Sequence, residues 1–92
     1  MVQSTEGKGL ERTLKALANP RRIAIVRCLK NRREASVSTI AEEIRLSFRA
    51  TSKHLAILAA AGIVDKEQRS LQMFYFLAND LSAPARHILK VI

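Results

Sequence analysis

The sequence holds one cysteine, no tryptophan, three glycines and two prolines in 92 residues. The single thiol, Cys28, excludes an intramolecular disulfide framework and any site built on two thiolates of one chain. The longest uncharged run, residues 54–64, is far shorter than the ~20 residues that a membrane helix needs. Residues 1–12 contain no apolar run typical of a secretory signal. We therefore expect a cytoplasmic protein with no membrane partner.

The length suffices for one small domain, and 48% hydrophobic with 26% charged residues is typical of a globular chain. We expect a single domain over residues 1–92, with the polar residues 1–8 frayed. Positive charge is concentrated between Arg12 and Lys53, a segment that contains eleven Lys and Arg residues and only three Glu residues. The charges in the rest of the chain sum to zero. Such a segment favours a nucleic-acid partner, while a generally basic, solvated surface is the alternative.

Apolar spacing predicts a mainly α fold with a small β-hairpin (α+β), in the order α-α-α-α-β-β-α. Asn19 and Pro20 suit the start of a helix, Gly62 suits the end of one, and residues 31–36 suit an irregular break. The expected elements are helices at 5–18, 21–30, 37–44 and 49–61, strands at 63–67 and 72–78 around a turn at 68–71, and a helix at about 80–92.

The third and fourth helices, separated by about three residues, outline a helix-turn-helix. Steps of about 100° per residue divide the fourth helix into two faces. The inner stripe comprises Thr51, Leu55 and Leu58, and the outer face comprises Phe48, Arg49, Ser52, Lys53 and Ala56. The major groove of duplex DNA admits such a helix, and side chains near its N-terminus reach base edges. An ordinary solvated helix face is the alternative.

Four segments carry a family resemblance that covers about residues 10–90: LANPRR (17–22), SKHLAIL (52–58), AAAGIV (59–64) and FYFL (74–77). The chain resembles the ArsR/SmtB-type winged helix-turn-helix regulators. The resemblance implies a homodimeric repressor that binds an inverted-repeat operator in double-stranded DNA and is released by a ligand. It implies a recognition helix at about 48–61 and a wing at 63–78 that lies on the flanking backbone or minor groove.

The DNA-binding residues predicted from the helix faces and the resemblance are Ser47, Phe48, Arg49, Thr51, Ser52, Lys53, His54 and Arg69. Family wings usually carry a glycine at the tip, and the turn QRSLQ (68–72) has none, which leaves the reach of Arg69 open. The first and last helices, 10–18 and 80–92, carry apolar residues that either form a dimer interface or complete the core of one chain. The predicted interface residues are Leu10, Leu14, Leu17, Ile88, Leu89 and Ile92.

We predict no metal site, no cofactor and no catalytic group. The stretch STIAEEIR (38–45) lacks the paired cysteines of the family's metal sensors, and Ala85 occupies the position of the acid two residues before His87. No nucleophile with a nearby base and no Gly-rich phosphate loop is recognisable. We expect Cys28 to pack in the core as a small hydrophobic residue, with thiol sensing as the alternative. The alternative function is a winged-helix module that binds a protein or RNA without base-specific DNA readout.

Overall fold

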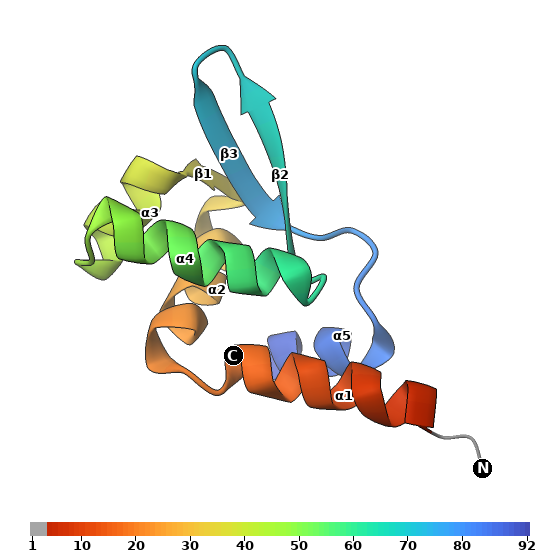
Figure 1. Ribbon diagram of the computed structural model, residues 1–92. Helices are drawn as coiled ribbons and strands as arrows, with labels where there is room; N and C mark the ends of the chain where they lie inside the picture. The colour runs from red at the N-terminus through yellow and green to blue at the C-terminus, as the bar shows by residue number, and fades with distance from the viewer. Residues whose placement is uncertain (1–3) are drawn as a thin grey trace.

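A computed structural model describes residues 4–92 of the chain. Its elements are α1 (Ser4–Leu17), α2 (Pro20–Arg32), β1 (Glu34–Ser36), α3 (Val37–Ile44), α4 (Phe48–Ala60), β2 (Val64–Arg69), β3 (Gln72–Leu77) and α5 (Ala83–Val91). The β2–β3 hairpin extends beyond the helices on one side, and α1 and α5 lie on the opposite side (Figure 1). The architecture is the winged helix-turn-helix that the sequence predicts.

Two expectations were wrong. Residues 31–36 are not an irregular break, because β1 pairs with β3 through Ala35 opposite Tyr75 and Ser36 opposite Phe74. A strand of three residues is too short to show a periodicity, and only its distant partner defines it. Residues 1–8 are not frayed throughout, since α1 begins at Ser4, and residues 1–3 lie outside the described part of the chain.

The helix ends follow the predicted capping residues. The Asn19 side chain accepts from the backbone N–H groups of Arg21 (2.9 Å) and Arg22 (3.1 Å), and Pro20 follows as the first residue of α2. Gly62 follows α4 with a φ of 75°, a left-handed conformation that glycine adopts without steric cost. These caps confirm the predicted start of α2 and the predicted end of α4, whereas α2 continues to Arg32, beyond the predicted end at about residue 30.

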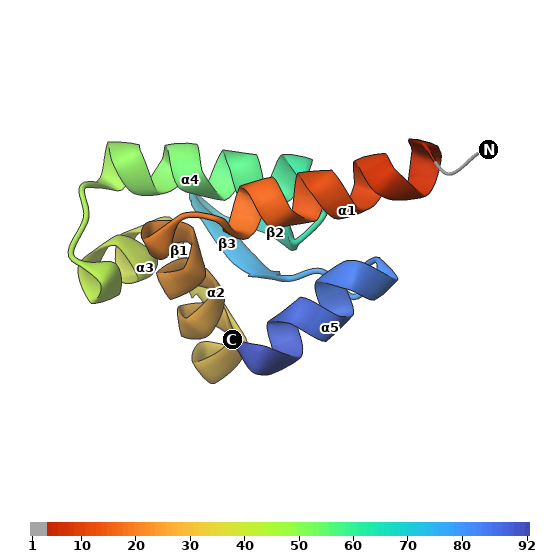
Figure 2. The ribbon, with the colours of Figure 1, turned by 90° about the horizontal axis from the view of Figure 1, so that it is seen from below.

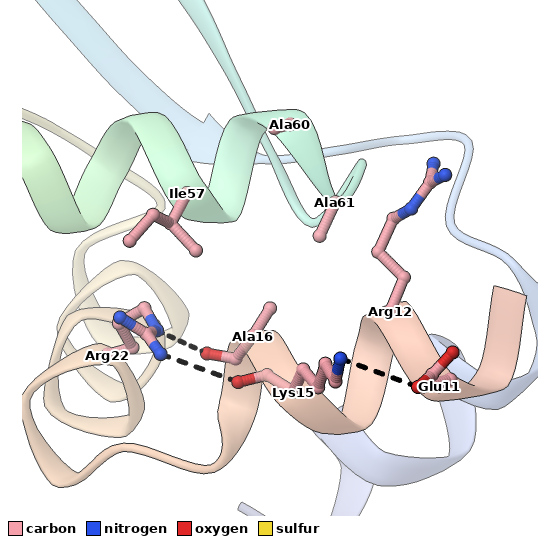
Figure 3. Close-up of a pocket in the computed structure, with 8 residues that line it drawn as sticks. All are labelled: Glu11, Arg12, Lys15, Ala16, Arg22, Ile57, Ala60 and Ala61. Atoms are coloured by element: carbon pink, nitrogen blue, oxygen red, sulfur yellow. Dashed lines mark hydrogen bonds and ion pairs between the residues drawn. The ribbon is translucent and has the colours of Figure 1, made fainter. Parts of the chain in front are cut away.

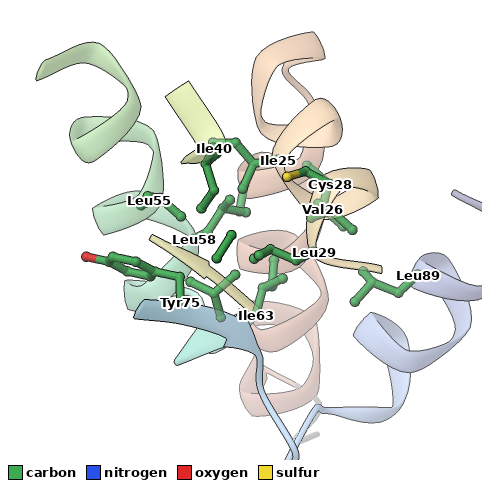
Figure 4. Close-up of a cluster of buried hydrophobic side chains, with 14 of the residues drawn as sticks. Ile25, Val26, Cys28, Leu29, Ile40, Leu55, Leu58, Ile63, Tyr75 and Leu89 are labelled. Carbon is green, nitrogen blue, oxygen red and sulfur yellow. The ribbon is translucent and has the colours of Figure 1, made fainter. Parts of the chain in front are cut away.

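The core is built around α2, which buries Ile25, Val26, Cys28 and Leu29 (Figure 4). The sheet has the order β1-β3-β2, and all its pairings are antiparallel. Tyr75 of β3 is buried against the helices, and Figure 4 shows it beside Leu58 and Ile63. α4 therefore rests on a packed core that fixes its orientation. Within residues 4–92, no helix has the length and apolarity to cross a membrane.

Candidate nucleic-acid interface

The turn between α3 and α4 is defined by a cap at each end. After α3, Arg45 adopts a left-handed φ of 58°, and the N–H of Leu46 donates to the carbonyl of Ala41 at 3.0 Å. The hydroxyl of Ser47 accepts from the N–H of Ala50 at 3.1 Å and begins α4. Because three residues complete both caps, the angle between the two helices is fixed locally.

The two faces of α4 are those that the sequence predicts. Leu55 and Leu58 are fully buried, whereas Phe48 is 58% exposed and the side chains of Arg49 and Lys53 point outward with Ser52 half-buried between them. The ion pairs of the described residues involve neither Arg49 nor Lys53. The first two turns of α4 thus present two unpaired cations and a hydroxyl to solvent.

Thr51 is wrongly placed among the predicted DNA-binding residues. It is fully buried, and within the described chain its hydroxyl oxygen has no hydrogen-bond partner. A side chain on this inner face packs between α4 and the core and cannot reach a base. The helical wheel correctly placed Thr51 on the inner stripe of α4. The family resemblance, in contrast, placed it among the DNA-binding residues.

His54 is held by a residue that the sequence analysis did not single out. Nη1 of Arg22 lies 3.2 Å from Nδ1 of His54 on α4, and other donors of Arg22 bond the carbonyls of Ala16 and Lys15 at the end of α1. Burial, followed by the charge of Arg22, lowers the pKa of His54. His54 is therefore the neutral acceptor of a contact that joins α1, α2 and α4, and its Nε2–H remains as a donor.

Arg69 contacts neighbouring side chains of the sheet. It donates to both carboxylate oxygens of Glu34 on β1, at 2.7 and 2.9 Å, and to Glu67 at 3.1 Å. Its guanidinium also lies over the ring of Phe74, 4.8 Å from the centroid. The Arg69 bond lowers the pKa of Glu34, and the two carboxylates raise the pKa of Arg69. The ion pair with Glu34 was missed because β1, which supplies Glu34, was not predicted, and the DNA contact of Arg69 stays a prediction.

The predicted dimer residues separate into two groups. Leu17 and Leu89 are only 6% and 5% exposed, so they belong to the core of one chain, and Ile88 and Ile92 pack against that core. Leu10 and Leu14 of α1 are 43% and 50% exposed. Val91, which belongs to the apolar set of the last helix, is 82% exposed on α5.

Residues 17–67 match a family model described as a helix-turn-helix domain. The solution structure of a homodimeric winged helix-turn-helix DNA-binding domain, Mb0332 from Mycobacterium bovis, superimposes with a TM-score of 0.85. It is 27% identical, with 97% of this chain and 80% of that chain covered, and is described as a possible ArsR-family transcriptional regulator. This chain belongs to the ArsR-type winged helix-turn-helix regulators.

Two relatives with assigned roles share this ArsR-type similarity. The transcriptional activator HlyU of Vibrio cholerae is 38% identical over 66 residues, and its reduced form superimposes with a TM-score of 0.80, covering 98% of this chain and 93% of that chain. A biofilm growth-associated repressor of Agrobacterium fabrum is 36% identical over 70 residues. The matched segments make up 72% and 76% of this chain, but only 60% and 59% of these curated relatives.

The described residues of this ArsR-type chain contain no group of three His, Cys, Asp or Glu side chains that could hold a metal ion. Cys28 is buried, and its pKa is raised to about 11 by burial and then by a hydrogen bond to Glu43. Glu43 in turn accepts from Arg32 at 2.6 Å. The thiol is thus protonated at neutral pH and enclosed by α2 and α3.

Proposed function

We propose that this chain is a homodimeric transcriptional regulator that binds duplex DNA sequence-specifically, with α4 in the major groove. The observation that carries the proposal is the outward face of the first turns of α4, where Arg49 and Lys53 take part in none of the ion pairs among the described residues and Ser52 lies between them. Ser47, Phe48 and His54 flank these residues. An Arg side chain suits guanine, a hydroxyl suits several base edges and Lys suits a phosphate.

The rest of the basic segment supports the phosphate contacts. Arg21 at the start of α2 and Arg45 in the turn between α3 and α4 are exposed. The wing charges cancel, since Asp65 and Glu67 offset Lys66 and Arg69. If three basic side chains of each protomer reach phosphates, the log–log salt slope is about −5, at ~0.9 for each phosphate. The hairpin then contributes to DNA binding through its shape more than through its charge. The tip of the hairpin presents Leu71, which is 96% exposed.

Dimerisation is proposed through α1 and α5, which pack together on the side of the molecule opposite the wing (Figures 1 and 2). Leu10 and Leu14 are the large apolar residues of α1 that remain exposed outside the core. Val91 is the corresponding exposed apolar residue of α5. A second copy that covers them would place two recognition helices in successive major grooves. The described DNA-binding domain Mb0332 is homodimeric, which supports this arrangement.

Occupying an operator excludes other proteins from that DNA, so we propose repression as the direct outcome of binding. The proposal places the chain in the cytoplasm with its DNA, as the family membership favours. It assigns no catalytic step, metal or cofactor to the chain. Residues 10–18 and 80–92 act in dimerisation, and the remainder of the single domain presents α4 and the wing.

Selection of bound sequences from a random duplex DNA pool tests the proposal. We expect an inverted repeat whose half-sites are about one helical turn apart, because a two-fold dimer repeats the same contacts. The selected fragment should bind at nanomolar protein in moderate salt, far more tightly than a scrambled fragment. A pool without enrichment, together with weak and sequence-blind retention, would instead favour a protein- or RNA-binding winged-helix module.

A further inference from the structure

A groove of about 790 Å³ lies between α1 and the C-terminal half of α4, away from the outward face of α4 that we propose reads DNA (Figure 3). α1 and α4 run side by side in opposite directions here (Figures 1 and 2). The lining residues are Glu11, Arg12, Lys15, Ala16, Arg22, Ile57, Ala60 and Ala61. Its size is typical of sites for small molecules.

The lining combines an apolar wall with an excess of positive charge. Ile57, Ala60 and Ala61 supply the wall on α4, and Ile57 is 43% exposed although it is a large aliphatic residue. The charged lining residues are Arg12, Lys15 and Arg22 against the single acid Glu11. A ligand that satisfies both features carries negative charge on an apolar body.

Only one of the three cations is without a described partner. Lys15 pairs with Glu11 at 3.4 Å, and Arg22 bonds backbone carbonyls at the end of α1 and the ring of His54. Arg12 makes no ion pair or side-chain hydrogen bond among the described residues, and Figure 3 shows it extending from α1 toward the Ala61 end of α4. The guanidinium of Arg12 is therefore available to a carboxylate, which it can bind with two parallel N–H donors.

The groove is separate from the proposed dimer face. Steps of about 100° place Leu10 and Leu14 within ~40° of each other on α1, whereas Arg12 lies more than ~150° from either. A second copy that covers the two leucines therefore leaves Arg12 and the groove open. Ligand binding and dimerisation use different sides of the same helix.

We propose that this groove binds an organic carboxylate with a compact apolar body, whose carboxylate pairs with Arg12 and whose body lies against Ile57 and Ala61. The occupant contacts both α1 and α4, which Arg22 already joins through Ala16 and His54. Ligand binding therefore couples to the position of α4. This second step, regulation of DNA binding, rests on the proposed function, whereas the binding site itself does not.

Titration of the isotope-labelled protein with octanoate, followed by NMR, tests the site. We expect the Ile57 methyl and Ala61 amide signals to shift saturably, while octylamine, which has a similar apolar body and the opposite charge, leaves them unmoved. Arg12→Gln should raise the Kd for octanoate about tenfold, since it removes a charge-assisted pair. Arg33→Gln, which neutralises an exposed arginine outside the groove, is the matched control and should bind as the wild type does.

Ile57→Asp places a carboxylate on the apolar wall at a site exposed enough to tolerate it, and it should abolish the octanoate shift of the Ala61 amide with the fold retained. Absence of groove shifts in the wild type would overturn the proposal, as would equal shifts with octylamine. If the groove signals instead change on dilution and ignore octanoate, a second copy of the chain occupies it and the proposal is wrong.

The regulatory step has its own readout. Saturating octanoate should change the Kd of the wild type for the selected DNA fragment by about fivefold or more, and should leave that of Ile57→Asp unchanged. An unchanged wild-type Kd with the groove shown by NMR to be occupied would overturn regulation and leave the site intact. Failure of the proposed function would be seen separately, as absence of specific DNA binding without octanoate.

Discussion

Burial explains why the lone thiol of this chain, Cys28, is a core residue. The thiol is buried on α2, and its hydrogen bond to Glu43 raises the pKa in addition to the effect of burial, to about 11. The reactive species of a cysteine is the thiolate. Both the protonation state and the enclosure of Cys28 therefore oppose thiol chemistry in the folded protein.

We expect Cys28 to react with an aromatic disulfide reagent at pH 8 about a hundredfold more slowly in the folded protein than in denaturant, from the lower thiolate fraction alone. Stopped-flow absorbance measures both rates. Glu43→Gln should speed the native reaction modestly because it removes the negative charge beside the thiol, and Glu42→Gln, an exposed neighbour, is the control. A native rate close to the denatured rate would contradict the assignment of Cys28 to the core.

His54 makes the stability of the chain depend on pH. Its pKa is lowered in the folded protein, by burial first and then by the charges of Arg22, Arg21 and Lys53. The unfolded chain therefore binds more protons below about pH 6.5, and the free energy of unfolding falls as the pH falls through that region. Thermal unfolding between pH 7.5 and pH 5 should show this decline, and His54→Gln should flatten it.

The matched control for His54 is His87→Gln, which removes an exposed histidine from α5 and should keep the wild-type decline. A decline that is the same in the wild type and in His54→Gln would show that other groups cause it. The contact behind the prediction was not accessible from the sequence, because Arg22 and His54 are 32 positions apart and neither belongs to a recognisable pair.

The β-sheet is where the sequence analysis fails most, and one omission explains the failure. β1 has three residues, so no alternation is visible, and its position depends on pairing with β3 about forty residues later. Without β1, Glu34 has no predicted neighbour, and Arg69 is assigned to DNA by its place in the wing. The helices were predicted well because their caps and apolar stripes are local signals.

We expect Arg69→Ala to lower the free energy of unfolding modestly, since it removes partly exposed ion pairs and the cover of Phe74. Chemical denaturation measures the loss. Lys66→Ala, an exposed position on the same strand, should leave stability unchanged. If Arg69→Ala instead retains stability but flattens the salt slope of DNA binding by about two units for the dimer, Arg69 is a phosphate contact and the structural role is wrong.

The arrangement of the described residues separates the proposed tasks of the molecule. α4 and the hairpin face one side, α1 and α5 the other, and the α2 core lies between them (Figure 1). The sequence predicted this division through the basic segment and the apolar terminal helices. It could not assign each apolar residue to core or surface, because Leu14 and Leu17 on α1 look alike until α5 packs against that helix.

Leu10→Asp with Leu14→Asp should give monomers that remain folded, because both side chains are already about half exposed. Sedimentation measures the mass, and circular dichroism checks the fold. Leu71→Asp, at the exposed wing tip, is the control and should remain dimeric. Monomers should also lose tight DNA binding, since one half-site alone is weak. An unchanged dimer in the double variant would place the interface elsewhere.

The central claim is that α4 reads base edges, and the most direct measurement is the ratio of the Kd values for scrambled and selected DNA in the wild type and three variants. In the wild type this ratio should be large. Arg49→Ala should reduce it by about tenfold or more, because a lost base contact costs about 1–3 kcal/mol only on the right sequence. Lys53→Ala should weaken binding to both fragments alike and keep the ratio. Equal losses on both fragments for Arg49→Ala and Ser52→Ala alike would contradict the account.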